Sequence, residues 1–192
     1  MESHQGPAMR ISWVLADATL VDATIDINQL KNIGPFWGGW RTWRSYNTDN
    51  VVCHQATDAR TLVHKNFHAR CNMYLPSSVY QEINRPPGVK LYQGEFHQIV
   101  DHPDDIVSMH LASANNDIVL LLGFDLTPRN LDQDKMAKHQ WHNYKNYVLT
   151  IVKNNPQVQW VLIDHSPEIE KEFKDIPNLM FDTLTNILTQ FK

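Results

Sequence analysis

Five consecutive aliphatic residues, from Ile118 to Leu122, stand between a polar stretch (115–117) and Gly123. A run of this length is too short for an independent helix, and its lack of polar alternation predicts a strand buried on both faces, as in the middle of a parallel sheet. Gly123 and Phe124 then lead to Asp125 at the carboxyl end of the strand. Parallel α/β sheets bind ligands outside this end of their strands, so we expect any binding or catalytic site of the protein there.

Other apolar runs predict further strands along the chain. These are residues 9–16, 50–54, 72–75, 89–92, 158–164 and 179–181. Helical periodicity and capping residues predict helices between them: a poorly bounded one before Lys31, then 58–68, 77–84, 103–113, 134–154, a short one from Ser166, and 183–191. This alternation predicts an α/β fold, a three-layer Rossmann-like domain with a mainly parallel sheet and right-handed crossovers.

Length, charge and cysteine content narrow the function classes. The 192 residues suit a single α/β domain over 9–192, after a flexible leader or expression remnant at 1–8. A formal charge of −4 provides no overall basic field for nucleic acid or an anionic membrane, and no run approaches the roughly 18 apolar residues of a membrane span. Cys53 and Cys71 have neither a metal-binding spacing nor a disulfide framework, which predicts free thiols and a cytoplasmic location.

Polar residues follow the predicted strands at several points. They are Asp17, His54, His97, Asp125, Asp164, His165 and Ser166. In a parallel sheet these groups share one edge, which predicts that they line the principal ligand pocket. The simpler interpretation is that a chain turns polar wherever it leaves a buried strand.

Ten histidines make the charge of the protein sensitive to pH between about 5 and 8. His139 and His142 lie three residues apart on the predicted helix 134–154, away from its apolar stripe, and could share one ion or proton-transfer task. Simple exposure to solvent is the alternative. The His and Asp residues at 97–105 look like metal ligands, but one irregular segment does not establish convergent geometry. A solvated acidic helix cap is favoured there, and no metal site is predicted.

Residues 34–44 are rich in glycine, tryptophan and arginine, which predicts an irregular loop. The indole of Trp40 could stack on a base or a sugar, while Arg41 and Arg44 could grip a phosphate. Alternatively, the tryptophans of this loop cover an edge of the sheet. Gly38 and Gly39 permit a close backbone approach that plain packing does not require, which keeps the ligand interpretation open.

The order of Asp117–Asp125, the histidine-bearing helix and Trp160–Ser166 resembles the later half of the Rossmann-like glycosyltransferases of the bacterial sialyltransferase-like group, over about residues 106–170. The resemblance implies a nucleotide or nucleotide-sugar ligand and a transferase activity. It further implies that His139 or His142 is the general base and that Asp125 is a structural or substrate-orienting carboxylate. Residues 164–166 would then contact the nucleotide.

Several nucleotide and hydrolase motifs are missing from the sequence. The first predicted strand has no Gly-x-Gly-x-x-Gly after it, and the chain has no Walker loop and no Gly-x-Ser-x-Gly elbow. A dinucleotide dehydrogenase, a P-loop phosphotransferase and a standard serine hydrolase are therefore disfavoured. Residues 16–19, Ala-Asp-Ala-Thr, also stand where the glycosyltransferase group carries a glycine-rich loop.

The leading hypothesis is a nucleotide- or nucleotide-sugar-binding transferase, in which a histidine deprotonates an acceptor hydroxyl and arginines hold the leaving phosphate. The alternative is a non-catalytic recognition protein that binds a nucleotide-like ligand or a protein partner through residues 37–44. A metal-dependent hydrolase is a third hypothesis. The sequence identifies neither a cofactor nor an oligomeric state.

Overall fold

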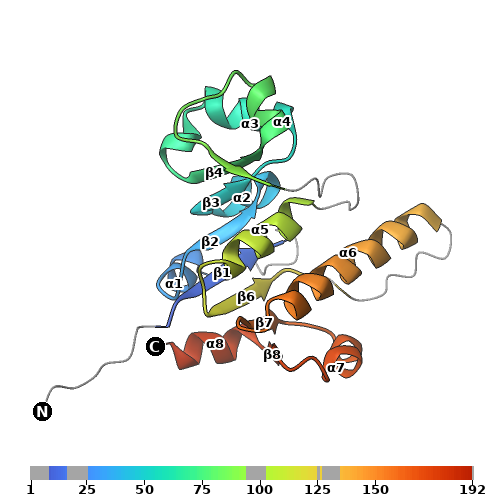
Figure 1. Ribbon diagram of the computed structural model, residues 1–192. Coiled ribbons are helices and arrows are strands. Elements are labelled where there is room, and N and C mark those ends of the chain that lie inside the picture. Colours follow the sequence, from blue (N-terminus) through green and yellow to red (C-terminus); the bar gives the residue numbers. More distant parts are fainter. Residues whose placement is uncertain (1–8, 17–25, 94–102, 125, 127–134, 192) are drawn as a thin grey trace, which may run out of the picture.

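The computed structural model describes residues 9–16, 26–93, 103–124, 126 and 135–191. Within these ranges, eight strands form one sheet in the order β5-β4-β3-β2-β1-β6-β7-β8 (Figure 1). Every pair of neighbouring strands is parallel. With helices on both faces of the sheet, this arrangement confirms the predicted three-layer, Rossmann-like α/β fold.

The elements follow the predicted alternation closely. The strands are β1 (Ile11–Leu15), β2 (Phe36–Gly39), β3 (Asn50–Val52), β4 (Asn72–Pro76), β5 (Lys90–Tyr92), β6 (Ile118–Leu122), β7 (Gln159–Ile163) and β8 (Leu179–Asp182). The helices are α1 (Ile27–Lys31), α2 (Trp40–Tyr46), α3 (Ala56–His64), α4 (Ser77–Glu82), α5 (Pro103–Ser113), α6 (Lys135–Asn154), α7 (Pro167–Phe173) and α8 (Leu184–Gln190), with a 3₁₀ turn at Phe67–Ala69. Every strand except β2, and every helix except α2, coincides with a predicted element. No helix in these described ranges is both long enough and apolar enough to cross a membrane.

The strand order reverses beside β1. Strands β2 to β5 succeed one another outward on one side of β1, and β6 to β8 do so on the other side. Buried residues of α1 and α8 and of α2, α3 and α4 pack on one face of the sheet, whereas those of α5, α6 and α7 pack on the opposite face. The junction of β1 and β6 is therefore the topological switch point, outside which doubly wound sheets open a ligand crevice.

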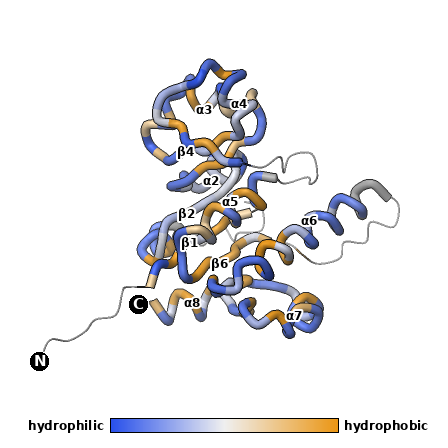
Figure 2. Tube along the Cα trace, in the orientation of Figure 1, coloured by the Kyte–Doolittle hydropathy of each residue, from blue (hydrophilic) through white to orange (hydrophobic). Residues whose placement is uncertain are grey.

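The central strands are buried on both faces, as predicted for residues 118–122. Side chains of β6 alternate between the two cores, with Val119 and Leu121 in one and Leu120 and Leu122 in the other. Figure 2 shows this strand as one of the strongly hydrophobic stretches of the trace. The neighbouring β1 sends Trp13 to the second core, where its indole N–H donates to the Leu30 carbonyl at 3.0 Å. The burial of both strands gives the switch point a rigid base.

The prediction of a loop at residues 34–44 is wrong. These residues form β2 and the first part of α2, and Phe36 and Trp37 are buried in the sheet. Gly38 and Gly39 lie in β2, and a helix packs closely against the strand at each of them, one helix on each face of the sheet. A Cβ atom at Gly39 would lie 2.7 Å from the Cβ of Asp104 in α5, and one at Gly38 would lie 3.1 Å from the side chain of Thr42 in α2. The close packing of these helices explains why positions 38 and 39 carry no side chain. The two glycines therefore give no support to a ligand contact.

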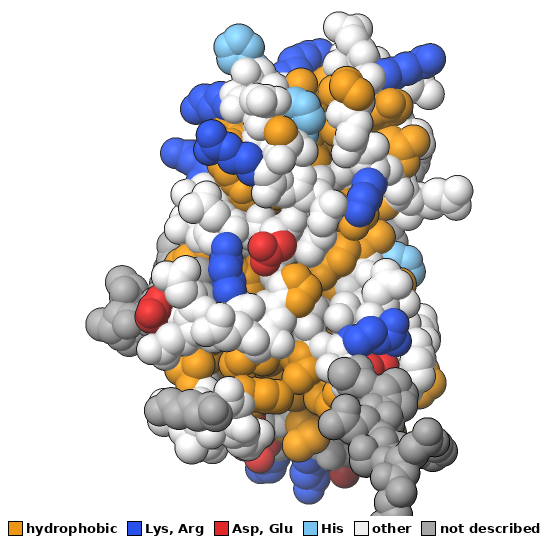
Figure 3. Space-filling model, turned by 90° about the vertical axis from the view of Figure 1, so that its left-hand side faces the viewer, with side chains coloured by type: hydrophobic (Ala, Val, Ile, Leu, Met, Phe, Trp, Pro, Cys, Tyr) orange, Lys and Arg blue, Asp and Glu red, His pale blue; other side chains and the backbone are white. Residues whose placement is uncertain are grey.

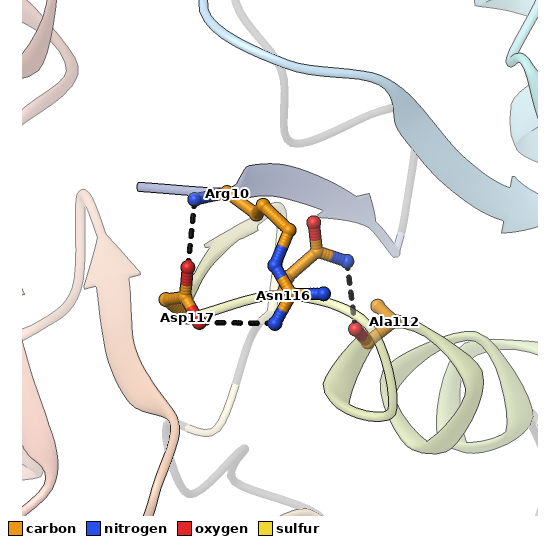
Figure 4. A network of polar contacts seen from close by, with 4 residues as sticks. All are labelled: Arg10, Ala112, Asn116 and Asp117. Atoms are coloured by element: carbon orange, nitrogen blue, oxygen red, sulfur yellow. Dashed lines mark hydrogen bonds and ion pairs between the residues drawn. The ribbon is translucent and has the colours of Figure 1, made fainter. Parts of the chain in front are cut away.

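The amino-terminal edge of the sheet is fastened by an ion pair (Figure 4). Asp117 accepts hydrogen bonds from the backbone N–H of Arg10 at 2.8 Å and from its guanidinium at 3.2 Å. The Arg10 carbonyl in turn accepts from the backbone N–H groups of residues 117 and 118. The amide of Asn116 donates to the Ala112 carbonyl at 2.8 Å, which ties the end of α5 to the same corner. These hydrogen bonds from Arg10 lower the pKa of the Asp117 carboxyl.

Substitution of Asp117 by asparagine is expected to change how stability depends on pH. The folded pKa of Asp117 lies below its unfolded value, so the ionised carboxylate contributes stability above about pH 4, and this contribution is lost as the pH falls through the folded pKa. Urea unfolding at stepwise lower pH should show wild type more stable than Asp117→Asn at pH 7, with the difference closing in acid. A difference that stays constant with pH would contradict this role. Glu82→Gln, which breaks an exposed pair with Arg60, should change stability little.

Candidate functional site

The carboxyl edge of the sheet carries two separate polar groups. His54 follows β3, and residues 164–166 follow β7, so the structure places these predicted site residues at one edge as expected. Strands β2, β1 and β6 lie between them, which at about 4.8 Å per strand separates the two groups by about 19 Å. Asp17, His97 and Asp125 were also predicted for this edge, but they lie outside the described residues. On the side shown in Figure 3, which faces away from this edge, most of the Lys and Arg side chains lie in the upper part of the view, and the few Asp and Glu side chains lie below them.

A pocket opens at the carboxyl ends of β6 and β7, beside the switch point. Its apolar walls come from both strands, from residues 124 and 126 and from α7; they include Leu122, Phe124, Leu126, Leu162 and Ile169. Its polar lining consists of Asp164, His165 and Ser166. Gly123 lines the pocket at the end of β6 with a positive φ of 80°, a conformation in which a side chain would be strained. Mostly apolar walls with few polar groups are typical of small-molecule sites.

Two polar atoms of this lining are shielded from solvent and lack a described partner. The Nε2 atom of His165 lies 3.2 Å from the Glu170 carboxylate, which can only accept, so Nε2 carries a hydrogen, and in the neutral ring Nδ1 is then an acceptor. This Nδ1 atom and the Ser166 hydroxyl oxygen are both buried, and no residue in the described part of the chain hydrogen-bonds to either. Buried polar atoms are normally paired, because leaving one unsatisfied costs about 1–3 kcal/mol. Within the described residues, the pocket lining therefore has one ring nitrogen and one hydroxyl group without a hydrogen-bond partner.

Asp164 has a structural partner. Its backbone adopts a left-handed conformation with φ of 52°, and its carboxylate accepts from the backbone N–H of Leu184 at 3.2 Å. That N–H belongs to the first turn of α8, where a carboxylate is favoured by the helix dipole and by the unpaired donors. Asp164 thus joins β7 to α8 as well as lining the pocket.

The second polar group centres on a histidine–aspartate pair. The Nδ1 atom of His54 lies 2.8 Å from the Asp104 carboxylate, and the two side chains are 20% and 15% exposed. Burial, followed by the charge of Asp104, raises the pKa of Asp58, while His54, Arg41 and Arg44 lower it. Burial and the charge of Asp104 also raise the pKa of Tyr92 and of the Cys53 thiol. The pair lies in a crowded and partly desolvated environment.

Asp104 and Asp105 do not form the solvated helix cap that the sequence favoured. Both occupy the first turn of α5, as predicted, but Asp105 is buried and accepts a hydrogen bond from the Tyr144 hydroxyl at 3.3 Å. Tyr144 in turn stacks on Phe124, whose ring centroid lies 6.4 Å away. The partners of both carboxylates come from distant parts of the chain, which explains why sequence spacing gave the wrong environment. Among the residues with described positions, no cluster of three or more His, Cys, Asp or Glu side chains could hold a metal ion.

The tryptophans of residues 37–43 serve packing. Trp37 and Trp43 are buried, and Trp40 stacks on Trp43 with ring centroids 5.5 Å apart. The Arg44 guanidinium lies 5.8 Å from the centroid of the Trp40 ring. Arg41 and Arg44 are exposed on α2, which begins at the carboxyl edge. The tryptophans thus pack, as the alternative interpretation held, but Trp37 does so from within strand β2 and Trp43 from helix α2 rather than from a loop over the sheet edge. The two arginines are exposed and lie near enough to Asp58 to lower its pKa.

His139 and His142 are exposed on α6 and are not part of the pocket lining. His139 Nε2 lies 3.2 Å from the side-chain amide of Asn143 one turn later. Both residues lie on the polar side of the helix, which agrees with the alternative expectation that they are simply exposed to solvent. Neither is brought close to His54 or to the β6–β7 pocket by a described contact. Cys53 and Cys71 are free thiols, as predicted.

No protein-family model matches this chain, and no curated protein is significantly similar to it.

Proposed function

We propose that this protein is a nucleotide- or nucleotide-sugar-binding transferase whose nucleotide base occupies the β6–β7 pocket. The observation that carries the proposal is the pair of buried, unsatisfied polar atoms in that lining, His165 Nδ1 and the Ser166 hydroxyl, in the described part of the chain. A base edge presents donors and acceptors side by side, and its ring faces are apolar. It therefore suits apolar walls with one acceptor and one hydroxyl.

The position of the pocket supports a nucleotide over a purely apolar ligand. It lies beside the β1–β6 switch point, where doubly wound sheets bind nucleotides. A second polar group stands about 19 Å away along the same edge. A nucleotide sugar is elongated, with a base at one end and a transferable sugar at the other, and this shape suits an edge with two separate polar groups.

A thermal-shift screen tests the proposal. Uridine, guanosine, cytidine and adenosine diphosphates and their sugar conjugates would be compared at saturating concentration, where a ligand at a hundred times its dissociation constant adds about 2.7 kcal/mol of apparent stability. We expect one base class to raise the melting temperature. No shift with any of these ligands would count against the proposal, and a shift without any nucleotide release in a turnover assay would favour the non-catalytic recognition protein.

Ser166→Ala is expected to separate binding from stability. The Ser166 hydroxyl lacks a described partner and makes no side-chain capping bond at the start of α7, so its removal should leave the unfolding free energy unchanged or slightly higher. The affinity for the nucleotide found in the screen should fall about tenfold, the equivalent of one lost hydrogen bond of about 1.4 kcal/mol. Calorimetric titration and urea unfolding measure the two quantities. Ser77→Ala, in the exposed first turn of α4, is the matched control and should bind like wild type.

A further inference from the structure

We propose that His54, oriented by Asp104, is the base that removes the proton from the acceptor hydroxyl. The inference rests on the transferase function proposed above and assigns its chemical step to residues that the glycosyltransferase resemblance did not indicate. The resemblance implied His139 or His142, which are exposed on α6.

The geometry of the pair suits proton transfer. A carboxylate can only accept, so the 2.8 Å contact between Asp104 and His54 Nδ1 places the ring hydrogen on Nδ1. In the neutral ring, Nε2 is then an acceptor, and no residue in the described ranges hydrogen-bonds to it. A base whose second nitrogen is held by a carboxylate is the arrangement that activates hydroxyl nucleophiles in unrelated folds.

Three elements that are distant in the sequence meet at this pair. His54 follows β3, Asp104 stands in the first turn of α5, and Gly39 ends β2 directly against Asp104. A side chain at position 39 would collide with Asp104, whose Cβ lies 2.7 Å from the place of the added Cβ atom. The side chain of His54 is 20% exposed, so it is held firmly without being sealed from solvent.

The charges around the pair suit a reaction with an anionic leaving group. Arg41 and Arg44 lie close enough to Asp58 to lower the pKa of its carboxyl, and Asp104 lies close enough to raise it, so both arginines are in the neighbourhood of the pair. The guanidinium groups can stabilise the negative charge that develops on a departing phosphate. Asp58 and Asp104 supply negative charge on the side of the base, which stabilises an imidazolium.

In the proposed step, His54 accepts the proton of the acceptor hydroxyl while the sugar moves from the nucleotide to the acceptor. The acceptor oxygen forms a bond to the anomeric carbon while the bond from that carbon to the phosphate oxygen breaks. The electron pair of the broken bond leaves with the nucleotide, and the hydroxyl proton passes to Nε2 of His54. Asp104 keeps its charge and stabilises the imidazolium through Nδ1.

The test measures nucleotide release from UDP-glucose, GDP-mannose and CMP-linked sialic acid, with water and with lactose as acceptors. His54→Gln should lower the rate at least 100-fold, the lower range of general-base effects, while the affinity for the free nucleotide stays within twofold of wild type. Asp104→Asn should also slow release, because an amide no longer fixes the ring hydrogen on Nδ1. His64→Gln, an exposed histidine on α3, is the matched control, and His139→Gln and His142→Gln should likewise keep the wild-type rate.

The outcomes separate this inference from the proposed function. Normal release by His54→Gln overturns the assignment of the base and leaves the transferase standing. Wild-type protein that releases no nucleotide from any of the three donors overturns both. If His54→Gln does not fold, the ¹⁵N shifts of the wild-type imidazole decide, because a neutral ring with its hydrogen on Nε2 contradicts the assignment and one with its hydrogen on Nδ1 supports it.

Discussion

Trp13→Ala is expected to lower the free energy of unfolding by about 3–5 kcal/mol, the usual effect of truncating a fully buried tryptophan. Trp13 has no exposed surface, meets Phe36 edge-to-face at 6.1 Å between ring centroids, and donates its indole N–H to the Leu30 carbonyl. Its removal leaves a cavity beside β1 at the centre of the sheet and takes away one of the hydrogen bonds to the Leu30 carbonyl, which still accepts from the backbone N–H of Ile33 at 3.0 Å. The cavity lies at the strand that forms one side of the switch point, and the lost hydrogen bond joined this strand to α1.

Urea unfolding of Trp13→Ala and of Trp40→Ala checks this prediction. Trp40 is only partly buried, so its truncation should destabilise the protein by clearly less. Equal effects of the two substitutions would show that β1 does not have the central position in the core described above.

Gly39→Ala is expected to destabilise the protein by about 1–3 kcal/mol, the range for overpacking a well-filled site. The added methyl group would meet the first turn of α5 at Asp104, where the first atom it reaches is a Cβ that cannot rotate away. The helix must shift from β2, and this shift should also lengthen the contact between Asp104 and His54. Thermal unfolding gives the stability, and the imidazole ¹⁵N shifts of His54 report on the contact.

Gly38→Ala provides a graded control for this substitution. Its added methyl would meet the Thr42 side chain at 3.1 Å, a milder contact on the opposite face of the sheet, and would leave α5 in place. We expect a smaller loss of stability and an unchanged signal from His54. A larger effect at position 38 than at position 39 would contradict the account of how α5 packs on β2.

Local patterns in the sequence correctly predicted most of the strands and helices. The unbroken aliphatic run at 118–122 predicts a buried central strand, and Pro103 with its neighbouring aspartates predicts the start of α5; both are confirmed. β2 escaped prediction because two of its four residues are glycines, which are poor strand formers by themselves. Their place in the sheet depends on the close approach of α2 and α5, which sequence periodicity does not reveal.

The candidate site was predictable only in part. A parallel sheet brings His54 and residues 164–166 to one edge, and the sequence correctly predicted that edge. The separation of the two groups depends on strand order, because β7 does not lie next to β3 in the sheet. The partner of His54 stands 50 residues later in the chain, and no local signal marks Asp104 as that partner.

The central claim is that a nucleotide base binds in the β6–β7 pocket, and a ¹H–¹⁵N NMR titration tests it most directly. The nucleotide that gives the largest thermal shift would be added to labelled protein, with Ser166→Ala as the comparison. Binding in the pocket predicts the largest backbone shift changes at Gly123, His165 and Ser166, together with a change in the His165 imidazole signals as Nδ1 gains a partner. Shift changes confined to residues outside this pocket, such as the hollow between α6 and α7 near Pro156 and Phe173, would contradict it.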